Sequence, residues 1–518
     1  MYFGIEAFYK IYIILRVCSF TLFCFIFKFY FYIFFFLLYS TAVDFPTSQH
    51  RDYQLQTKNL DNTLYSPMVS LQQLTISILL LFTASVQSLD INVDDKDSIC
   101  SADKYVVQGI WNYYEGLKYG GTVGMFAPPN YWWNAGEAFG GLVDFYTYCQ
   151  SDNSTLEKLI YNGMYHQAGE NYNYIPSNQS MTEGNDDQGV WGMAIMEAVE
   201  RNFTEPESHS WLEMVQAVFN TMNARWDADN CGGGLRWQIF TWNSGYDYKN
   251  SISNGCLFHL AARLARYTGN SSVYVDTAEK VWKWMEDVGF LTEEDNGDVR
   301  IYDGAKITNN CSSVTDLRWS YTYGVFMAGC AYLYNFTGDD VWLTRTNEIV
   351  QASLSYFFAN KIMQETTCQP QNKCNNDQRS FRCLFSRCLG LTTQLAPETK
   401  DKIREVLEAS AEGAAKSCSG GSDGVTCGEN WAIDKWDGVY GLGEQTSALE
   451  VMMALIVEPP LSVKTGGTNR TDYSAGTNSE DNANKNELTI TGKDKAGAGV
   501  LTAIVLAVIL GGAIWMIF

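Results

Sequence analysis

The chain has 518 residues, of which 46% are hydrophobic, and its 58 Asp and Glu outnumber 36 Lys and Arg to give a formal net charge of −22 at pH 7. Such an acidic chain is a poor match for the phosphate backbone of nucleic acid, so a neutral or weakly charged polymer fits better as a partner. With only 4 histidines, chemistry that depends on several imidazole groups is disfavoured.

Two apolar runs open the chain. The first, residues 17–39, is rich in Phe and Tyr. The second, residues 74–84, follows Met68 and ends at small residues spaced as in a signal-peptide cleavage site. Its length is that of a signal-peptide core rather than of a membrane span. We therefore expect 68–88 to be a signal peptide. Residues 1–67 are then a gene-model extension or, less favoured, a signal anchor outside the fold.

Residues 89–460 form the body of the chain, without a long linker. In 252–267, Leu257, Leu260 and Leu264 lie on one apolar stripe, which is the pattern of an amphipathic helix. The same periodicity predicts helices over residues 102–118, 136–149, 154–167, 187–203, 209–225, 252–267, 272–287, 317–336, 339–358, 379–395, 398–415 and 443–457. This succession predicts an all-α fold, an α/α barrel with six inner and six outer helices. Two stacked helical bundles are the alternative.

The connections between these segments are rich in glycine and aromatic residues. Examples are residues 131–136, 170–174, 231–237 and 246–250. Glycine lets the backbone approach a neighbour closely, and aromatic faces with a polar edge suit the rings of sugars. A single Trp of this kind more often belongs to the core. Several gathered in loops favour a sugar-binding surface.

Asp186 and Asp187 stand side by side where the apolar pattern of 187–203 begins. Paired carboxylates are what glycoside hydrolysis needs, because one attacks the sugar carbon or positions water while the other protonates the leaving oxygen. The positive potential of a helix start should keep Asp186 ionised, and its charge should raise the pKa of Asp187. The alternative is that the pair merely caps the helix, as Asp often does.

The cysteines point to an oxidising route. Of 14 cysteines, two lie in the first apolar run, and the other twelve fall between Cys100 and Cys427, which predicts up to six disulfides. Four lie close together and predict a stapled loop rather than a zinc site: Cys368, Cys374, Cys383 and Cys388. Seven N-glycosylation sequons agree with this route: Asn153, Asn178, Asn202, Asn270, Asn310, Asn335 and Asn469.

The C-terminal segment has the order of a GPI-anchor signal. Residues 461–499 are rich in Gly, Thr, Asn and Ser, and the uncharged apolar run 500–518 follows. Small attachment residues, a polar spacer and an apolar tail that is removed are typical of that signal. Asn482, Asn484 and Gly492 are the candidate attachment residues. A transmembrane tail helix is the alternative, although no basic segment follows the apolar run.

Five motifs spread over residues 89–460 carry a resemblance to a known family: Trp132 to Gly136, Thr182 to Trp191, Trp226 to Trp237, Tyr248 to Gly255 and Trp319 to Gly324. Together they resemble glycoside hydrolase family 76, the endo-α-1,6-mannanases, and within it the GPI-anchored yeast cell-wall members. The resemblance implies an (α/α)6 barrel and a retaining mechanism with Asp186 as nucleophile and Asp187 as general acid/base. No metal or cofactor is expected.

The resemblance also implies a substrate and a location. The candidate sugar-contacting residues are Trp132, Trp133, Asn134, Trp237, Tyr248 and Asn250. The expected donor is α-1,6-mannan or the mannose core of a GPI glycan, and β-glucan is a possible acceptor if the enzyme links GPI-anchored mannoproteins to wall glucan. The protein would then act in cell wall biogenesis at the outer face of the plasma membrane. A non-catalytic wall protein that binds mannan in the same cleft is the alternative.

Overall fold

The computed structural model describes residues 88–294, 298–422, 424–477 and 492–517. The expected leader, the expected signal peptide apart from Ser88, and the candidate attachment residues Asn482 and Asn484 lie outside the described residues. Within the described body, helices dominate and the few strands are short.

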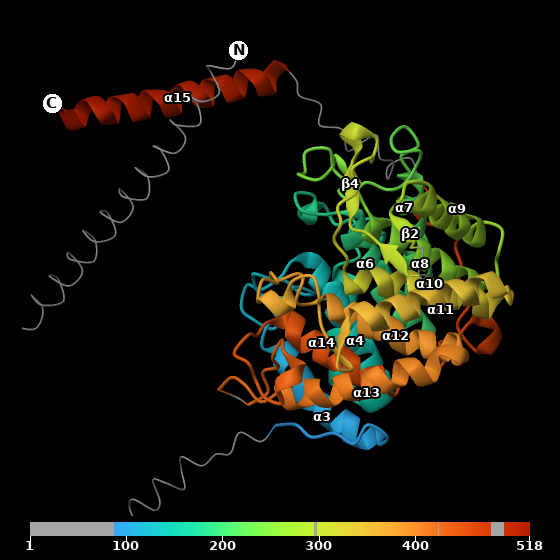
Figure 1. Cartoon of the computed structure of the whole chain (residues 1–518). Coiled ribbons are helices and arrows are strands. Elements are labelled where there is room, and N and C mark those ends of the chain that lie inside the picture. Colours follow the sequence, from blue (N-terminus) through green and yellow to red (C-terminus); the bar gives the residue numbers. More distant parts are fainter. Residues whose placement is uncertain (1–87, 295–297, 423, 478–491, 518) are drawn as a thin grey trace, which may run out of the picture. The chain divides into compact units, whose positions relative to one another are not determined.

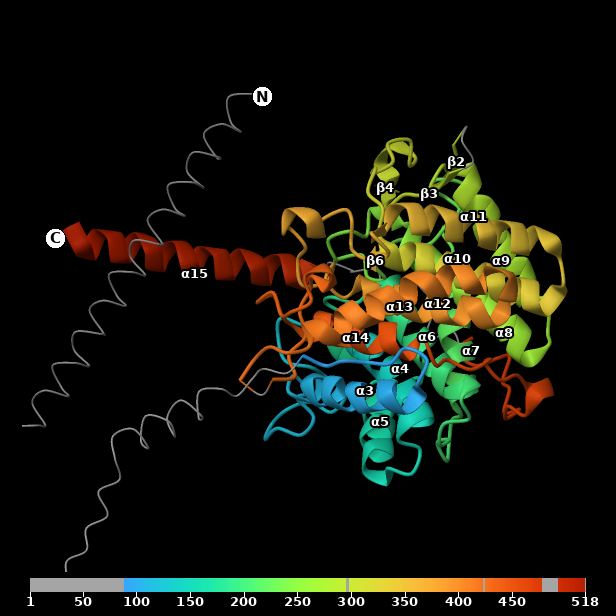
Figure 2. The same ribbon diagram turned by 60° about the horizontal axis from the view of Figure 1, so that its bottom comes forward.

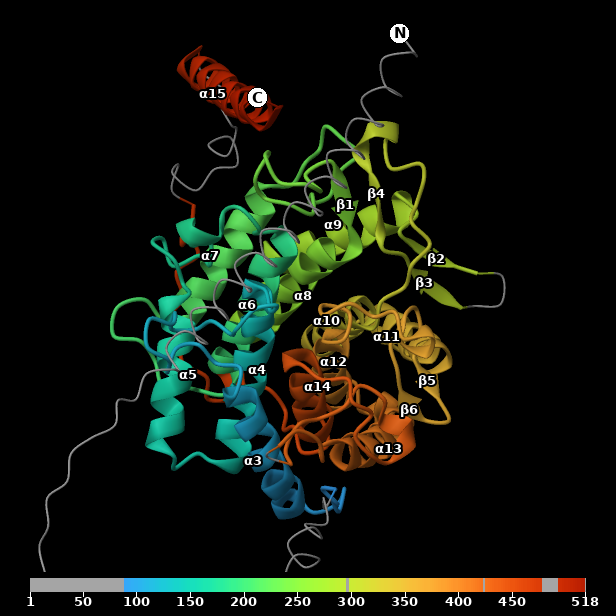
Figure 3. The same cartoon turned by 90° about the vertical axis from the view of Figure 1, so that its left-hand side faces the viewer.

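Six helices form an inner ring. They are α4 (Trp132–Cys149), α6 (Asn185–Glu200), α8 (Ser251–Thr268), α10 (Ser320–Thr337), α12 (Phe381–Leu395) and α14 (Leu442–Met453). Each packs against the next, and α14 packs against α4, which closes the ring (Figure 3). The closed ring confirms the (α/α)6 barrel and rules out two stacked bundles.

The outer helices connect the inner ones and pack on their outer side (Figure 1). They are α3 (Lys96–Trp111), α5 (Ser154–His166), α7 (Trp211–Ala224), α9 (Tyr274–Asp287), α11 (Asp340–Tyr356) and α13 (Lys400–Ser417). The two rings differ in burial because inner helices have neighbours on every side. Nearly every residue of α8 is buried, whereas α9 buries only one face and exposes Asp276, Glu279 and Lys280.

Short antiparallel strand pairs decorate the connections. β1 (Tyr248–Asn250) pairs with β4 (Gly304–Lys306), β2 (Leu291–Glu293) with β3 (Val299–Ile301), and β5 (Phe358–Ala359) with β6 (Ile362–Met363). Single 3₁₀ turns lie at Ser177–Gln179, Ile307–Asn309, Gln369–Gln371, Pro397–Thr399, Trp431–Ile433 and Val463–Thr465. The β1–β4 pair matters most for the site, because β1 leads directly into α8.

The first predicted helix is wrong in position. The periodicity predicted 102–118, but α3 begins at Lys96, where the Asp95 side chain accepts a hydrogen bond from the Asp97 amide, and ends at Trp111. The buried Tyr114 and Phe126 that follow belong to a loop packed on the core, so their apolar character does not indicate helix. The other eleven segments coincide with helices, with ends shifted by a few residues.

Four disulfides form among the described residues, fewer than the six that the cysteine count allowed. They join Cys100 to Cys149, Cys231 to Cys311, Cys368 to Cys374, and Cys418 to Cys427. The predicted stapled loop therefore contains one bridge, since Cys383 and Cys388 are free and buried in α12. Five helical residues span about 7.5 Å along the axis. That separation is too long for these two cysteines to bridge each other.

The folded body continues beyond the expected boundary at residue 460. The Leu461 amide donates to the Glu200 carbonyl (3.1 Å), and the Tyr267 hydroxyl donates to the Thr468 carbonyl (2.9 Å). Farther along, the Asp472 amide donates to Gln216 Oε1 (2.8 Å). Residues 461–477, here called the C-terminal strap, thus run beside α7 and α8 instead of forming a free linker (Figure 2).

The last described element is α15 (Gly492–Ile517). Its stretch Lys495–Gly512 is long and apolar enough to cross a membrane by length and composition. The same property is expected of the apolar tail of a GPI signal, so the helix alone does not choose between the two modes of anchoring.

Candidate active site

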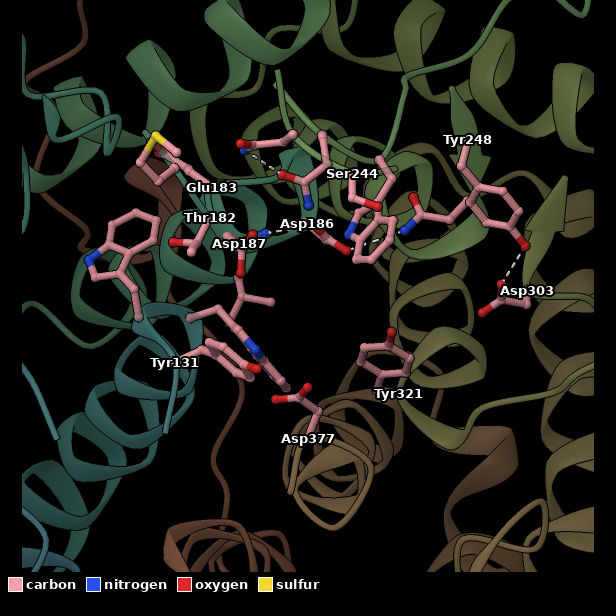
Figure 4. Close-up of a pocket in the computed structure, with 18 of the residues that line it drawn as sticks. Tyr131, Thr182, Glu183, Asp186, Asp187, Ser244, Tyr248, Asp303, Tyr321 and Asp377 are labelled. Atoms are coloured by element: carbon pink, nitrogen blue, oxygen red, sulfur yellow. Dashed lines mark hydrogen bonds between the residues drawn. The ribbon is translucent and has the colours of Figure 1, made fainter. Parts of the chain in front are cut away.

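A cleft with a volume of ≈ 460 Å³ opens where the inner helices begin (Figure 4). Its walls come from the first turns of α4, α6, α10 and α12 and from the strand that leads into α8. The lining residues are Tyr131, Trp132, Trp133, Met181, Thr182, Glu183, Asp186, Asp187, Val190, Trp237, Gln238, Asn243, Ser244, Tyr248, Asn250, Asp303, Tyr321, Asp377 and Phe381. The barrel thus gathers at one end residues that are far apart in the sequence.

The cleft is acidic. Five carboxyl side chains line it: Glu183, Asp186, Asp187, Asp303 and Asp377. No Lys, Arg or His is among its described lining residues. Helix starts present unpaired N–H groups and the positive end of the helix dipole, which favour negative charge nearby. Such a site suits a neutral sugar and the positive charge that develops on a sugar ring during glycosidic cleavage.

The two adjacent aspartates lie in the first turn of α6. Asp187 Oδ2 accepts a hydrogen bond from the Gly184 amide (2.5 Å), and Asp186 Oδ1 accepts one from the Asp187 amide (3.1 Å). From the end of β1, Asn250 Nδ2 donates to Asp186 Oδ2 (3.2 Å). A Cβ at position 184 would lie 2.4 Å from Asp186 Oδ1 and 2.9 Å from the Trp237 carbonyl oxygen, so this turn requires glycine. Both carboxyls are therefore held in fixed orientations.

Burial changes the expected ionisation of the pair. It raises the pKa of Asp186 to about 7, although hydrogen bonds from Asn250 and the backbone act in the opposite direction. Burial and the charge of Asp186 raise the pKa of Asp187 well above its ordinary value, as expected. The prediction that the helix start keeps Asp186 readily ionised is therefore wrong, because desolvation outweighs the dipole here. Glu183, buried beside Asp187, has its pKa raised by burial as well.

Five of the six expected sugar-contacting residues line the cleft: Trp132, Trp133, Trp237, Tyr248 and Asn250. Backbone bonds hold two of them together, because the Trp237 amide donates to the Tyr248 carbonyl (2.7 Å). The Tyr248 hydroxyl donates to Asp303 Oδ2 (2.6 Å). Trp132 is only 3% exposed, and its indole donates to Gln167, so it backs the wall more than it faces the cleft.

Asn134, the sixth, lies outside the cleft. Its Oδ1 accepts from the Tyr131 amide (3.0 Å), and its Nδ2 donates to Ser380 Oγ (3.3 Å), so it joins the start of α4 to the start of α12. The seven sequon asparagines all lie in the described part of the chain, and none of them is buried.

Several lining residues carried little signal in the sequence. Glu183 and Tyr321 lie within recognised motifs, but nothing marked their side chains. Asp303 and Asp377 lie outside those motifs, and each arrives in the cleft through a connection. Asp303 precedes β4, the partner of β1, and Asp377 lies four residues before Phe381, where α12 starts. Each of these two aspartates stands shortly before an element that begins at the cleft, β4 for Asp303 and α12 for Asp377. That position is the sequence signal that could have identified them.

The described residues contain no group of three or more His, Cys, Asp or Glu that could hold a metal ion. The carboxyls of the cleft instead lie beside aromatic side chains and amide groups. The carboxyl, amide and aromatic side chains that face the cleft can act on a sugar through hydrogen bonds, proton transfer and ring contacts.

Comparison with known proteins agrees with this geometry. Residues 98–465 match the model of glycosyl hydrolase family 76. The chain is 51% identical to mannan endo-1,6-alpha-mannosidase DFG5 of Saccharomyces cerevisiae over 446 residues, which are 85% of this chain and 96% of that protein. It is 52% identical to mannan endo-1,6-alpha-mannosidase DCW1 of Candida albicans over 451 residues, 85% of this chain and 98% of that one.

Solved structures share the fold. Dfg5 from Chaetomium thermophilum, in complex with glucosamine, superposes with a TM-score of 0.71 at 36% identity and covers 76% of this chain and 99% of its own. The GH76A alpha-1,6-mannanase from Salegentibacter superposes with a TM-score of 0.55 at 18% identity over 69% of this chain and 99% of its own.

Proposed function

Because this chain belongs to glycosyl hydrolase family 76, and is a glycoside hydrolase of the mannan endo-1,6-α-mannosidase type, we propose that Asp186 and Asp187 cleave the α-1,6-mannosidic bond with retention of configuration. The observation that carries this proposal is the pair itself, two adjacent carboxyls fixed on the floor of an acidic, aromatic cleft. Asp186 acts as the nucleophile, and Asp187 protonates the leaving oxygen and later deprotonates the incoming hydroxyl.

The local contacts support this division of roles. Asn250 donates to Asp186, which favours the ionised form that a nucleophile needs. The charge of Asp186 raises the pKa of Asp187, so that Asp187 holds a proton while Asp186 is ionised. Tyr248, Trp133 and Trp237 provide the ring surfaces on which the sugars lie.

Replacement of the nucleophile tests the proposal. We expect Asp186→Asn to lower activity on α-1,6-mannooligosaccharides by several orders of magnitude, while Asp276→Asn on the exposed face of α9 leaves activity unchanged. Products analysed by NMR during the first minutes should keep the α configuration. Survival of most of the activity in Asp186→Asn would refute the assignment, and binding without turnover by the wild type would favour a non-catalytic mannan-binding protein.

We further propose that transfer, not hydrolysis, is the physiological outcome, with the mannose core of a GPI glycan as donor and β-glucan as acceptor. A glycosyl-enzyme on Asp186 can be taken by a sugar hydroxyl in place of water. The aromatic cleft supports this, since it can hold an acceptor ring next to the intermediate. Incubation with a labelled mannose donor and a β-glucan oligosaccharide should give adducts by mass, absent in Asp186→Asn. Hydrolysed donor alone at high acceptor concentration would exclude transfer.

We also propose that the protein, which its relatives indicate is secreted or at the cell surface, is held there by a GPI anchor. The four disulfides are compatible with passage through an oxidising compartment. Deletion of residues 500–518 should release the protein into the medium, and phosphatidylinositol-specific phospholipase C should release the full-length form. Retention that only detergent reverses would instead indicate a transmembrane tail.

A further inference from the structure

One carboxyl of the cleft lies across from the reacting pair. In Figure 4, Asp377 faces Asp186 and Asp187 from the other side of the open space, with Tyr131 and Tyr321 to either side. Asp377 comes from the loop that precedes α12, whereas the pair comes from α6. A cavity of ≈ 460 Å³ falls in the range that buries ligands larger than one sugar ring. The two sides of the cleft can therefore contact different sugar units.

The loop of Asp377 is held by contacts that leave its carboxylate nearly free. The Cys368–Cys374 disulfide closes the chain just ahead of it. The Asn375 amide donates to Gln378 Oε1 (2.9 Å), and the Gln378 amide returns a bond to Asn375 Oδ1 (2.9 Å). The fixed backbone thus presents the Asp377 side chain without depending on it.

Two neighbours extend this framework into the barrel. Ser380 Oγ donates to the Asp377 carbonyl (2.8 Å) and accepts from Asn134 of α4 (3.3 Å). Arg379 forms an ion pair with Glu444 of α14 (2.7 Å). The start of α12 is therefore tied to two inner helices, and the position of Asp377 is set by the barrel.

The carboxylate itself is poorly supplied with donors. The Trp133 side chain acts on it as a hydrogen-bond donor that lowers its pKa, and Oδ1 is buried without a hydrogen-bond partner among the described residues. A buried carboxyl oxygen without a donor is costly, and sites that leave one unpaired in the empty state commonly satisfy it with ligand. Burial raises the pKa of Asp377 to about 6, in agreement with the missing donor.

The surroundings of Asp377 supply flat apolar surface. Phe381 stacks on Tyr321 with ring centroids 3.8 Å apart and planes at 5°, and Trp133 lies 6.2 Å from Phe381. The disulfide packs behind this wall together with Trp319. A carboxylate at the edge of an aromatic wall binds a sugar through a hydroxyl while the ring face lies on the aromatic surface.

We propose that Asp377 is a substrate-contacting residue that binds a hydroxyl of the mannose unit next to the one on which Asp186 and Asp187 act. This inference rests on the proposed function, because it assumes an oligosaccharide in the cleft. Asp377 and Trp133 then determine the enzyme's preference for longer oligosaccharide substrates and take no part in cleavage of the bond.

Two substrates separate this role from catalysis. An aryl α-mannoside fills only the subsite at the reacting bond, whereas an α-1,6-mannotetraose also fills the neighbouring one. Asp377→Asn should lower kcat/KM on the tetraose by about 10- to 100-fold, the loss of one charge-assisted hydrogen bond. Its kcat/KM on the aryl α-mannoside should stay within about twofold. Asp401→Asn, exposed on α13, is the matched control and should change neither.

The double variant Cys368→Ser/Cys374→Ser should also lower kcat/KM on the tetraose relative to kcat/KM on the aryl α-mannoside, because it loosens the loop without altering the carboxylate. Equal losses on both substrates, or no loss on either, would overturn the inference. A binding titration in the Asp186→Asn background separates it from the proposed function. If that protein binds the tetraose equally with and without Asp377, only this inference fails, whereas absence of any binding removes the proposed function and the inference together.

Discussion

The two ends of the barrel hold similar buried carboxyls in opposite settings. At the cleft end, five carboxyls share a space into which no described lining residue brings a cation. Toward the other end, Arg263 pairs with Glu197 (2.9 Å) and Glu200 (2.5 Å), and Arg201 pairs with Asp144 (2.8 Å).

The pKa values of Glu197 and Asp186 illustrate this difference, although burial keeps the pKa of Asp144 raised despite Arg201. Burial alone would raise the pKa of Glu197, but the charges of Arg263 and Arg201 lower it below its ordinary value. Burial raises the pKa of Asp186 to about 7 because no cation opposes it. Carboxyls at the paired end therefore hold inner helices together, whereas those at the cleft end remain available to a substrate. Glu197 and Asp186 are both buried, so the difference between these two pKa values comes from their charged partners and not from burial.

The largest effect should come from removing a cation at the paired end. Arg263→Met leaves Glu197 and Glu200 buried without it, and we expect the free energy of unfolding to fall by about 3 to 5 kcal/mol. Denaturant unfolding followed by tryptophan fluorescence measures the loss. Lys283→Met, which breaks the exposed pair with Asp287, should leave the stability nearly unchanged. A loss as small as this control's would mean that the pairing does not support the barrel.

The C-terminal strap reinforces the paired end, because Leu461 bonds the carbonyl of Glu200 at the end of α6. A chain that stops after Pro460 loses this bond and those of Thr468 and Asp472, and its free energy of unfolding should fall by about 2 to 4 kcal/mol. A chain that stops after Thr477 keeps them and is the matched control. Equal stability of the two truncated proteins would show that the strap adds nothing to the fold.

At the cleft end, the sign of the pH effect on stability should be reversed. The folded pKa of Asp186, about 7, lies above its ordinary 3.8, so the folded state loses stability as pH rises between these values. Asp186→Asn removes this loss and should stabilise the protein by about 4 kcal/mol more at pH 8 than at pH 4. The paired Glu197 behaves oppositely, because its lowered pKa adds stability above the unfolded pKa that is lost as pH falls. Destabilisation of Asp186→Asn at pH 8 would contradict the comparison.

The smallest effect concerns the pH profile of activity. The acid limb of kcat/KM should lie well above the ordinary Asp pKa, because Asp186 must be ionised to attack. Asn250 donates to the ionised carboxylate, so Asn250→Ala should move this limb to still higher pH. Asn243→Ala, which removes a lining amide bonded to Gln238, serves as the control and should leave the limb in place. A limb unmoved by Asn250→Ala would mean that this hydrogen bond does not tune the nucleophile.

The sequence indicated the helices well because their apolar periodicity is a local property. The catalytic pair was visible for a similar reason, since Asp186 and Asp187 are neighbours in the chain. The end of the first helix was predicted wrongly because Tyr114 is apolar in order to pack in a loop, which periodicity cannot distinguish from a helix. The contacts of residues 461–477 with the body could not be predicted from the sequence, because the C-terminal strap is polar in composition yet bonds to the body through its backbone carbonyls and amides.

The helical succession, the adjacent aspartates and the family resemblance are evident in the sequence, because each depends on residues close together in the chain. Which residues share the cleft depends instead on how the helices pack. Asp303 and Asp377 reach it because ring closure brings the starts of the inner helices to one end. The tertiary structure also sets the ionisation of the pair, because desolvation depends on surrounding atoms from β1, α10 and α12 that no local pattern contains.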